Sequence, residues 1–327
     1  MTASPGIGDA FRPRLLAILG QTATGKSALA IALAERYGGE ILNCDSTAVF
    51  RGFDIGTDKV APEARRGIPH HLIDIADPTD EYTAAHFARD AARVAEEVHA
   101  RGHVPILVGG TGFYYRALTR GLFPGPGRDA GLRARLQAIA DRRGVEFLHR
   151  ILQRVDPPSA VRIQPRDGKR TVRALEVYFL TGRPLTVHFA DTVSPLAGWD
   201  VVGIALTLPA AELAPRLERR VHEQFARGLL DEIRALLARG IPEHVRPFGG
   251  FVYRQALEHL HGVRDEAATR ELIVRENRHY ARRQLIWFRK EPNLVWFRGA
   301  GESPAVFEQV TCTLDPHCGP AASDAAP

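Results

Sequence analysis

The stretch GQTATGKS, Gly20 to Ser27, has residue types and spacing suited to binding phosphate groups. It matches the pattern G-x-x-x-x-G-K-[ST], in which successive backbone N–H groups and the N-terminus of the following helix surround an anion. In this pattern Lys26 reaches the terminal phosphate and the Ser27 hydroxyl is a ligand for Mg²⁺. The sequence therefore predicts a phosphate site made of Gly20, Gln21, Thr22, Ala23, Thr24, Gly25, Lys26 and Ser27.

Two polar residues follow apolar runs and are expected beside this loop. Asp45 directly follows EILNC (40–44), and Thr111 follows VPILVGG. Ligands of open α/β sheets bind at the carboxyl ends of the strands, so both side chains would face one crevice. Asp45 has three possible roles there: Mg²⁺ ligand, general base or helix N-cap. A nucleotide hydrolase would usually carry an acidic residue at the end of VPILV, and its absence argues against simple ATP hydrolysis.

The segment RENRHYARRQLIWFRK (275–290) combines six basic residues with aromatic ones. On a helix, Arg275, Arg278 and Arg282 would form a stripe suited to a phosphate backbone, and arginine with aromatic side chains suits unstacked RNA bases. A solvated basic helix whose apolar residues face the core fits the same pattern, so both interpretations remain open at this point.

Cysteine and histidine give no metal-binding pattern. The three cysteines, Cys44, Cys312 and Cys318, are too scattered for a disulfide framework or a zinc site. His70 and His71 are adjacent, so on a strand they would lie on opposite faces, and a metal site there is not expected.

The elements that must position these residues alternate between strand and helix. Apolar runs at 15–19, 40–44, 104–108 and 199–208 are typical of buried strands, and the segments between the first three have helical periodicity. This alternation predicts an α/β fold with a parallel sheet and helices on both faces. A proline- and glycine-rich boundary, GLFPGPGRDAG, interrupts it at 121–131.

The chain is therefore expected to divide into a catalytic core and a helical insertion. The core would span 14–120 and 199–300, the insertion 121–198, and flexible ends 1–13 and 301–327. The insertion has 13 Lys and Arg against 7 Asp and Glu, whereas the whole chain has a net charge of +5. Because the positive charge is concentrated in one segment, we expect a surface that binds a polyanion, although a solvated helical face would have a similar composition.

The composition is that of an ordinary globular protein of 327 residues, with 45% hydrophobic and 25% charged residues. No apolar run approaches the roughly 18 residues of a membrane helix. The first residues, MTASPGIGDAFRP, lack the basic and apolar regions of a secretory signal. We therefore expect a cytoplasmic protein.

Taken together, six motifs resemble those of tRNA dimethylallyltransferases, also called tRNA isopentenyltransferases. They are GxTAxGKS, DSxxVFRGxDIGTxK, PHHLIDIxDP, VGGTGFYxxAL, RALEVYxLTGRP and RxYARRQxxWFR, in this order from about Leu15 to Phe297. The resemblance implies a P-loop NTPase-like fold. It also implies transfer of a dimethylallyl group from dimethylallyl diphosphate to N6 of the adenosine at tRNA position 37, 3′ of the anticodon, which gives N6-dimethylallyladenosine. Mg²⁺ is the implied cofactor, and a monomer without an obligate protein partner is the expected state.

The resemblance also implies roles for individual residues. Asp45 would be the base that accepts the N6 proton, Thr22, Lys26 and Ser27 would contact the diphosphate, and Arg246 would help it depart. The insertion would bind the tRNA anticodon stem-loop. The residues implied in tRNA binding are Asp45, Ser46, Thr47, Ala48, Thr111, Arg133, Lys169, Arg170, Thr171, Val172, Arg173, Arg278, Arg282, Arg283 and Gln284. The segment RPFGGFVYRQ (246–255) departs from the family pattern, so the pairing of Arg246 and Arg254 with the family's arginines stays open.

Two other functions fit part of the sequence. A P-loop phosphotransferase, such as a small-molecule or nucleoside kinase that uses ATP, would explain the glycine loop and Asp45 but neither the basic insertion nor the helix at 275–290. An RNA-binding protein gated by a nucleotide would need a hydrolytic switch, and the acidic residue for it is missing after VPILV.

Overall fold

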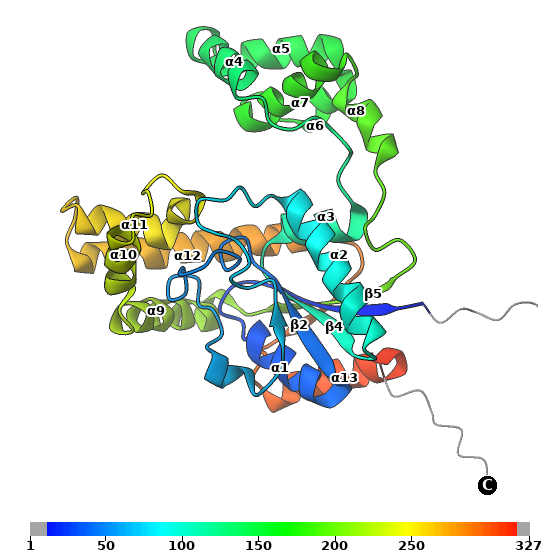
Figure 1. The fold of residues 1–327 in the computed structure, drawn as a ribbon, viewed down its shortest axis with the longest axis vertical. Helices are drawn as coiled ribbons and strands as arrows, with labels where there is room; N and C mark the ends of the chain where they lie inside the picture. Colours follow the sequence, from blue (N-terminus) through cyan, green and yellow to red (C-terminus); the bar gives the residue numbers. More distant parts are fainter. Residues whose placement is uncertain (1–11, 319–327) are drawn as a thin grey trace, which may run out of the picture. The chain divides into compact units, whose positions relative to one another are not determined.

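The structure is a computed structural model that describes residues 12–318. Within this range a six-stranded parallel sheet has the order β3-β2-β4-β1-β5-β6 (Figure 1). The strands are β1 (Arg14–Gly20), β2 (Gly39–Cys44), β3 (His70–His71), β4 (Val104–Gly109), β5 (Asp200–Thr207) and β6 (Leu294–Arg298). The predicted α/β fold class, a P-loop NTPase-like parallel sheet with flanking helices, is confirmed, and β3 and β6 are strands that the sequence did not reveal.

Helices cover this sheet because its central strands are apolar on both faces. Leu15 to Leu19 of β1 are all buried, as are Ile106 and Leu107 of β4. A strand buried on both sides needs a layer of helices on each face. The helices of this unit are α1 (Lys26–Tyr37), α2 (Ala84–Ala100), α3 (Gly112–Arg120), α9 (Ala210–Ala226), α10 (Leu229–Ala238), α11 (Phe251–Leu260), α12 (Glu266–Phe288) and α13 (Pro304–Cys318), with short 3₁₀ turns at Pro62–Arg65 and Arg246–Gly249.

Helix α13 corrects the expectation of a flexible tail from residue 301. Val306, Val310 and Leu314 recur every four residues on it and lie in the same buried cluster as α1 (Figure 1). Asp315 also accepts hydrogen bonds from Arg36 and Tyr37 of α1. The prolines and small residues of this segment masked a regular apolar spacing. Most of the predicted N-terminal flexible segment and residues 319–327 lie outside the described residues.

The helical segment that follows β5 is interrupted once, near its middle. The chain forms two helices there, α9 and α10, with Gly228 between them at φ 93°. This left-handed conformation ends a helix and is open mainly to glycine. The break turns α10 so that Glu232, in its first turn, meets the loop at 54–56.

Residues Arg120–Ala197 form a second compact unit with a core of its own. Its helices are α4 (Ala130–Arg143), α5 (Val145–Val155), α6 (Pro157–Arg162), α7 (Gly168–Thr181) and α8 (Leu185–His188), followed by a 3₁₀ turn at Phe189–Asp191. Glu176 is fully buried in this unit. Burial opposes ionisation of its carboxyl group, but hydrogen bonds from Arg133 and Arg173 outweigh burial and hold its pKa at about 2.

Candidate active site

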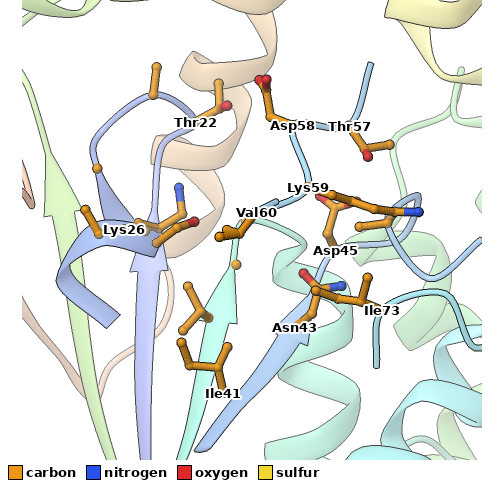
Figure 2. Close-up of a pocket in the computed structure, with 18 of the residues that line it drawn as sticks. Thr22, Lys26, Ile41, Asn43, Asp45, Thr57, Asp58, Lys59, Val60 and Ile73 are labelled. Atoms are coloured by element: carbon orange, nitrogen blue, oxygen red, sulfur yellow. The ribbon is translucent and has the colours of Figure 1, made fainter. Parts of the chain in front are cut away.

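The carboxyl ends of three neighbouring strands, β1, β2 and β4, bring the candidate residues together. Cys44 is the last residue of β2 and pairs with Gly109, the last residue of β4. Asp45 therefore follows directly where both strands end. The glycine loop follows β1 on the other side of β4. Figure 2 shows Lys26, at the start of α1, and Asp45, directly after β2, on different sides of one pocket. The predicted crevice at this edge of the sheet therefore exists.

The glycine loop has a backbone that few residues other than glycine adopt. Gly20 and Gly25 have φ values of 129° and 83°, and Ala23 between them has φ 62°. A Cβ atom at Gly25 would lie 2.0 Å from Oε2 of Glu302, and one at Gly20 would lie 2.2 Å from the Leu206 carbonyl oxygen. Because both positions are closed to side chains, the loop can run close to the sheet and direct its N–H groups into the pocket.

Two residues of the motif hold the loop in place and do not face the pocket. Gln21 is buried, and its side-chain oxygen accepts a hydrogen bond from Thr207 at 2.9 Å. Thr24 is also buried, and its hydroxyl donates to the Gln21 carbonyl oxygen at 2.8 Å. These two side chains therefore shape the loop, and the predicted phosphate contacts of Gln21 and Thr24 would be made by their backbone N–H groups, whereas Ser27 is exposed in the pocket.

Lys26 is the cation at the centre of the pocket. Its Nζ donates to the Gln21 carbonyl oxygen at 2.5 Å. Burial and, to a smaller extent, the positive charge of Arg220 lower the pKa of Lys26 to about 7, although the negative charge of Asp45 opposes both effects. Too little negative charge surrounds the ammonium group to keep it fully protonated at neutral pH. A bound phosphate would supply that negative charge.

Arg220 of α9 is a site residue that sequence reasoning missed. Its Nη1 donates to the Thr22 hydroxyl at 2.7 Å, and its Nε lies 2.8 Å from Oδ2 of Asp58. The Thr22 backbone N–H donates to Oε1 of Gln284 at 2.7 Å. Thr22 is therefore fixed by α9 and α12 together. The sequence around Arg220 is a charged amphipathic helix without a motif, so only the fold brings it to the loop.

Asp45 caps a turn, although no helix begins there as the N-cap role would require. Its Oδ1 accepts hydrogen bonds from the backbone N–H groups of Thr47 and Ala48, at 2.8 and 3.1 Å. The carboxylate thus caps the turn that follows β2. Both of these bonds go to Oδ1, so Oδ2 is the oxygen that can accept a proton in the pocket.

Two pockets meet at this carboxylate. The first contains the glycine loop and the ends of β2 and β4, and the second lies among α9, α11 and α12. The residues that line both pockets are Thr22, Asp45, Thr57, Asp58, Arg220 and Tyr280. Two substrates, one bound in each pocket, would therefore meet at Asp45.

Side chains from three helices hold the loop that carries Thr57 and Asp58. Glu232 accepts hydrogen bonds from the Ile55 N–H at 2.7 Å and from the Tyr253 hydroxyl at 2.6 Å. The Tyr253 hydroxyl in turn accepts from the Gly56 N–H at 3.0 Å. A Cβ atom at Gly56 would lie 2.5 Å from the Tyr253 ring. This close contact explains the glycine in the motif DIGT.

The residues expected from α12 and the end of β4 divide into two groups. Gln284 is buried, donates to the Gly110 carbonyl oxygen at 3.0 Å and lines the first pocket, and Arg283 lines the second. Thr111 accepts a hydrogen bond from the Ser46 N–H at 3.2 Å. Arg278 and Arg282 are exposed on the helix surface.

Within the helical unit, the expected tRNA-binding residues differ in exposure. Lys169 and Arg170 are exposed at the start of α7. Thr171 is fully buried, so its side chain cannot be a surface contact in this conformation. Arg133 and Arg173 are half-buried and bound to Glu176, and Val172 is also half-buried.

Arg246 does not reach the site. It donates a hydrogen bond to the Tyr82 carbonyl oxygen and is not among the residues that line either pocket. Arg254, eight residues later on α11, lines the second pocket. The position of Arg246, outside both pockets, therefore does not fit the expectation that it acts on the leaving group. Arg246 begins the 3₁₀ turn Arg246–Gly249, which precedes α11.

Comparison with known proteins identifies the family. A family model described as IPP transferase matches residues 48–291, most of the chain. The chain belongs to this family. A curated tRNA dimethylallyltransferase from Solibacter usitatus is 48% identical over 90% of this chain and 95% of its own length. Another from Geobacter metallireducens is 44% identical over 93% and 97%. The predicted family membership is thus confirmed, and the relatives are enzymes of the transferase class, which favours this function over a kinase.

Solved structures of the family have the same fold. The tRNA isopentenylpyrophosphate transferase of Bacillus halodurans is 35% identical, with a TM-score of 0.70, over 93% of this chain and 96% of its own. A eukaryotic dimethylallyltransferase, solved in the course of acting on tRNA, is 25% identical, with a TM-score of 0.76, over 96% of this chain and 82% of its own. In the described part of the chain, no helix is long and apolar enough to cross a membrane.

Proposed function

We propose that this protein transfers a dimethylallyl group from dimethylallyl diphosphate to N6 of the adenosine at tRNA position 37. The observation that carries the proposal is the position of Asp45 where two pockets meet. The first pocket has the features of a diphosphate site. The second pocket is lined by residues of α9, α11 and α12. Family membership supplies the identity of the two substrates.

The first pocket would hold the diphosphate. Lys26 provides a cation, Arg220 a second one, and residues of the glycine loop line the same space. Two negative phosphates would restore full protonation of Lys26. Arg220 already bonds to Thr22, so the positive charge is preorganised where the leaving oxygen develops its negative charge.

Transfer then needs one bond to form and one to break. The N6 lone pair attacks C1 of the dimethylallyl group and forms the N–C1 bond. The C1–O bond breaks, and its electron pair stays with the departing diphosphate. The amine gains a positive charge as it attacks, and Oδ2 of Asp45 accepts the proton from N6. Because the N6 lone pair is delocalised into the adenine ring, a base within hydrogen-bonding reach lowers the barrier to attack.

Mg²⁺ fits the residues of the first pocket. The exposed Ser27 hydroxyl stands in the first turn of α1, and hard oxygen ligands from a diphosphate would complete the coordination. Bound there, the ion would offset the negative charge of the diphosphate. Asp45 lies across the same pocket but is committed to its turn through Oδ1.

RNA binding would involve both units. The target base must leave the anticodon loop to reach the second pocket. There Arg254, Arg283 and Tyr280 provide cations and an aromatic ring. Exposed Arg278 and Arg282 on α12, and Lys169 and Arg170 on α7, are suited to phosphate contacts. The proposed function on tRNA supports a location in the cytoplasm.

Incubation of the protein with unmodified tRNA and a labelled donor tests this proposal. Prenyl-labelled dimethylallyl diphosphate should label the tRNA, and digestion should recover the label as N6-dimethylallyladenosine. ATP labelled in its γ-phosphate should leave the tRNA unlabelled. Label entering tRNA from ATP alone, or from neither donor, would refute the proposed function.

A further inference from the structure

A strained turn lies beside the first pocket, in the segment HHLID that precedes Ile75. Leu72 and Asp74 have φ values of 62° and 56°, and both are non-glycine residues in the left-handed region. L-residues adopt this region at a cost in free energy, and two left-handed residues separated by only one other residue are uncommon. The residue between them is Ile73.

The surrounding structure holds this turn from several sides. Asn43 of β2 donates to the Leu72 carbonyl oxygen at 3.2 Å, and the Asp74 N–H donates to the Ala48 carbonyl oxygen at 3.3 Å. Arg51 donates to the Asp74 carbonyl oxygen at 3.1 Å. These bonds come from β2 and the segment after it, so the turn is fixed to the same elements that carry Asp45.

Lys59 adds an ionic contact to the turn. Its Nζ lies 2.5 Å from Oδ1 of Asp74, 2.6 Å from Oδ1 of Asp54 and 2.7 Å from the Phe50 carbonyl oxygen. Its side chain is 5% exposed. A lysine has three N–H donors, and here each has an oxygen partner. Lys59 thus borders the first pocket without a donor left for phosphate, and its contacts fix the turn.

The result is that Ile73 faces the first pocket. Figure 2 shows Ile73 beside Asn43, with Val60 and Ile41 on the neighbouring side of the same space. Val108 of β4 is a further apolar residue that lines this pocket. A hydrocarbon group attached to a diphosphate at Lys26 would find apolar surface here.

Ile73 also separates this pocket from another hollow. A third pocket lies on the far side of the turn and is lined by Leu72, Ile75, Tyr82 and Val94, with Asp90, Arg93 and Glu97 among its polar residues. Ile73 and His70 are the residues that line both pockets. Removal of the Ile73 side chain beyond Cβ would therefore extend the first pocket towards the third.

We propose that Ile73, held inward by the strained turn and by Lys59, closes the hydrocarbon end of the donor pocket and limits the donor to a five-carbon chain. The inference rests on the proposed function, because it assigns the first pocket to a prenyl diphosphate. Ile73 is then a specificity-determining residue, and Lys59 is a positioning residue that acts through Asp74.

The test compares dimethylallyl diphosphate with geranyl diphosphate, the ten-carbon homologue. In Ile73→Ala, the ratio of kcat/KM for geranyl to that for dimethylallyl diphosphate should rise about tenfold or more, since a pocket discriminates by about this factor for small apolar differences. Ile73→Val should give a smaller rise. Ile75→Ala is the matched control, because Ile75 lines the third pocket but is 41% exposed and does not reach the first.

Lys59→Met tests the positioning role, since it keeps the length of the side chain and removes its charge. It should raise the same ratio, and Lys59→Arg should recover part of the selectivity through ion pairs with Asp54 and Asp74. A merely structural role would lower the turnover of both donors equally and leave the ratio unchanged.

Binding of the two diphosphates to the tRNA-free protein, measured by calorimetry, separates this inference from the proposed function. A gain of affinity for geranyl diphosphate in Ile73→Ala supports it even if no group reaches tRNA. An unchanged ratio and unchanged binding in Ile73→Ala, or an equal change in Ile75→Ala, would overturn it.

Discussion

The glycine loop and the exposed basic residues both suit phosphate, yet they are built differently. The loop is fixed by backbone geometry, by a hydrogen bond from the Thr22 N–H to Gln284 and by hydrogen bonds from Arg220 and Thr207, and its single lysine is half-buried. Arg282 and Lys169 instead stand exposed on helix surfaces. The loop is preorganised for one small anion, whereas the surface residues are suited to a long polyanion through many separate contacts.

This difference predicts how strongly single substitutions act. In a buried site each group has a fixed partner, and its loss cannot be compensated by water. An exposed cation interacts through solvent, is screened by salt and has neighbours that share its role. Substitutions in the site should therefore be severe and specific to one step, and those on the surface mild and sensitive to salt.

The largest effect is expected at Asp45. Asp45→Asn keeps an oxygen that can accept from the Thr47 and Ala48 N–H groups but cannot take the N6 proton. Its kcat should fall at least about a hundredfold, as for loss of a general base, while tRNA affinity in a filter-binding assay stays within about threefold. Asp45→Ala should lose the turn cap as well and be at least as impaired. If Asp45→Asn keeps most of its activity, the carboxylate serves only the turn.

A pH dependence follows from the lowered pKa of Lys26. Below a pH of about 7 the ammonium is charged and suited to the diphosphate, and above it the neutral amine prevails in the free enzyme. The kcat/KM for the donor, which reports the free enzyme, should thus fall as pH rises through about 7. In Lys26→Arg the side chain stays charged, so this fall should disappear, although the value at low pH is reduced by poorer fit. A flat wild-type profile to pH 9 would contradict the assignment.

A smaller effect is expected for Arg220, which acts beside the loop. Arg220→Gln should raise the KM for the donor about tenfold and lower kcat as well, because the residue touches Thr22 and both pockets. Arg219→Gln, one residue earlier on α9 with an exposed side chain paired to Glu223, is the control and should behave as wild type. Equal effects of the two substitutions would point to a general loss of positive charge.

The smallest effects are expected on the exposed surface. Arg282→Gln and Lys169→Gln should each raise the KM for tRNA about threefold, leave the KM for the donor unchanged, and reduce the slope of log affinity against log salt by about one. Arg89→Gln, exposed on α2, should change none of these. A changed KM for the donor in Arg282→Gln would contradict the distinction between the glycine loop and the exposed basic residues.

Much of the site could be predicted because its chemistry lies in contiguous motifs. The glycine loop, Asp45 and the sheet edge follow from local patterns that translate directly into backbone geometry. A motif does not tell which of its side chains point inward, and only the folded chain shows that those of Gln21 and Thr24 are buried.

Other parts could not be predicted because they depend on contacts distant in sequence. Arg220 is almost 200 residues from Thr22 and meets it only in the folded chain. Arg246 was expected in the site because its hydrogen bond to the Tyr82 carbonyl oxygen, which lies far away in the sequence, cannot be inferred from the segment RPFGGFVYRQ. The short strand β3 and the helix α13 gain their stability from the sheet and from α1, not from strong local patterns.

The most direct test of the central claim, that the glycine loop binds a leaving group, uses one donor with two labels. Dimethylallyl diphosphate labelled at C1 and in its phosphorus atoms is incubated with unmodified tRNA, and both labels are followed in the tRNA and the small-molecule products. The account predicts that the carbon label enters the tRNA while all the phosphorus label is recovered as free diphosphate, in equal amounts. Phosphorus label in the tRNA, or release of diphosphate without carbon transfer, would contradict it.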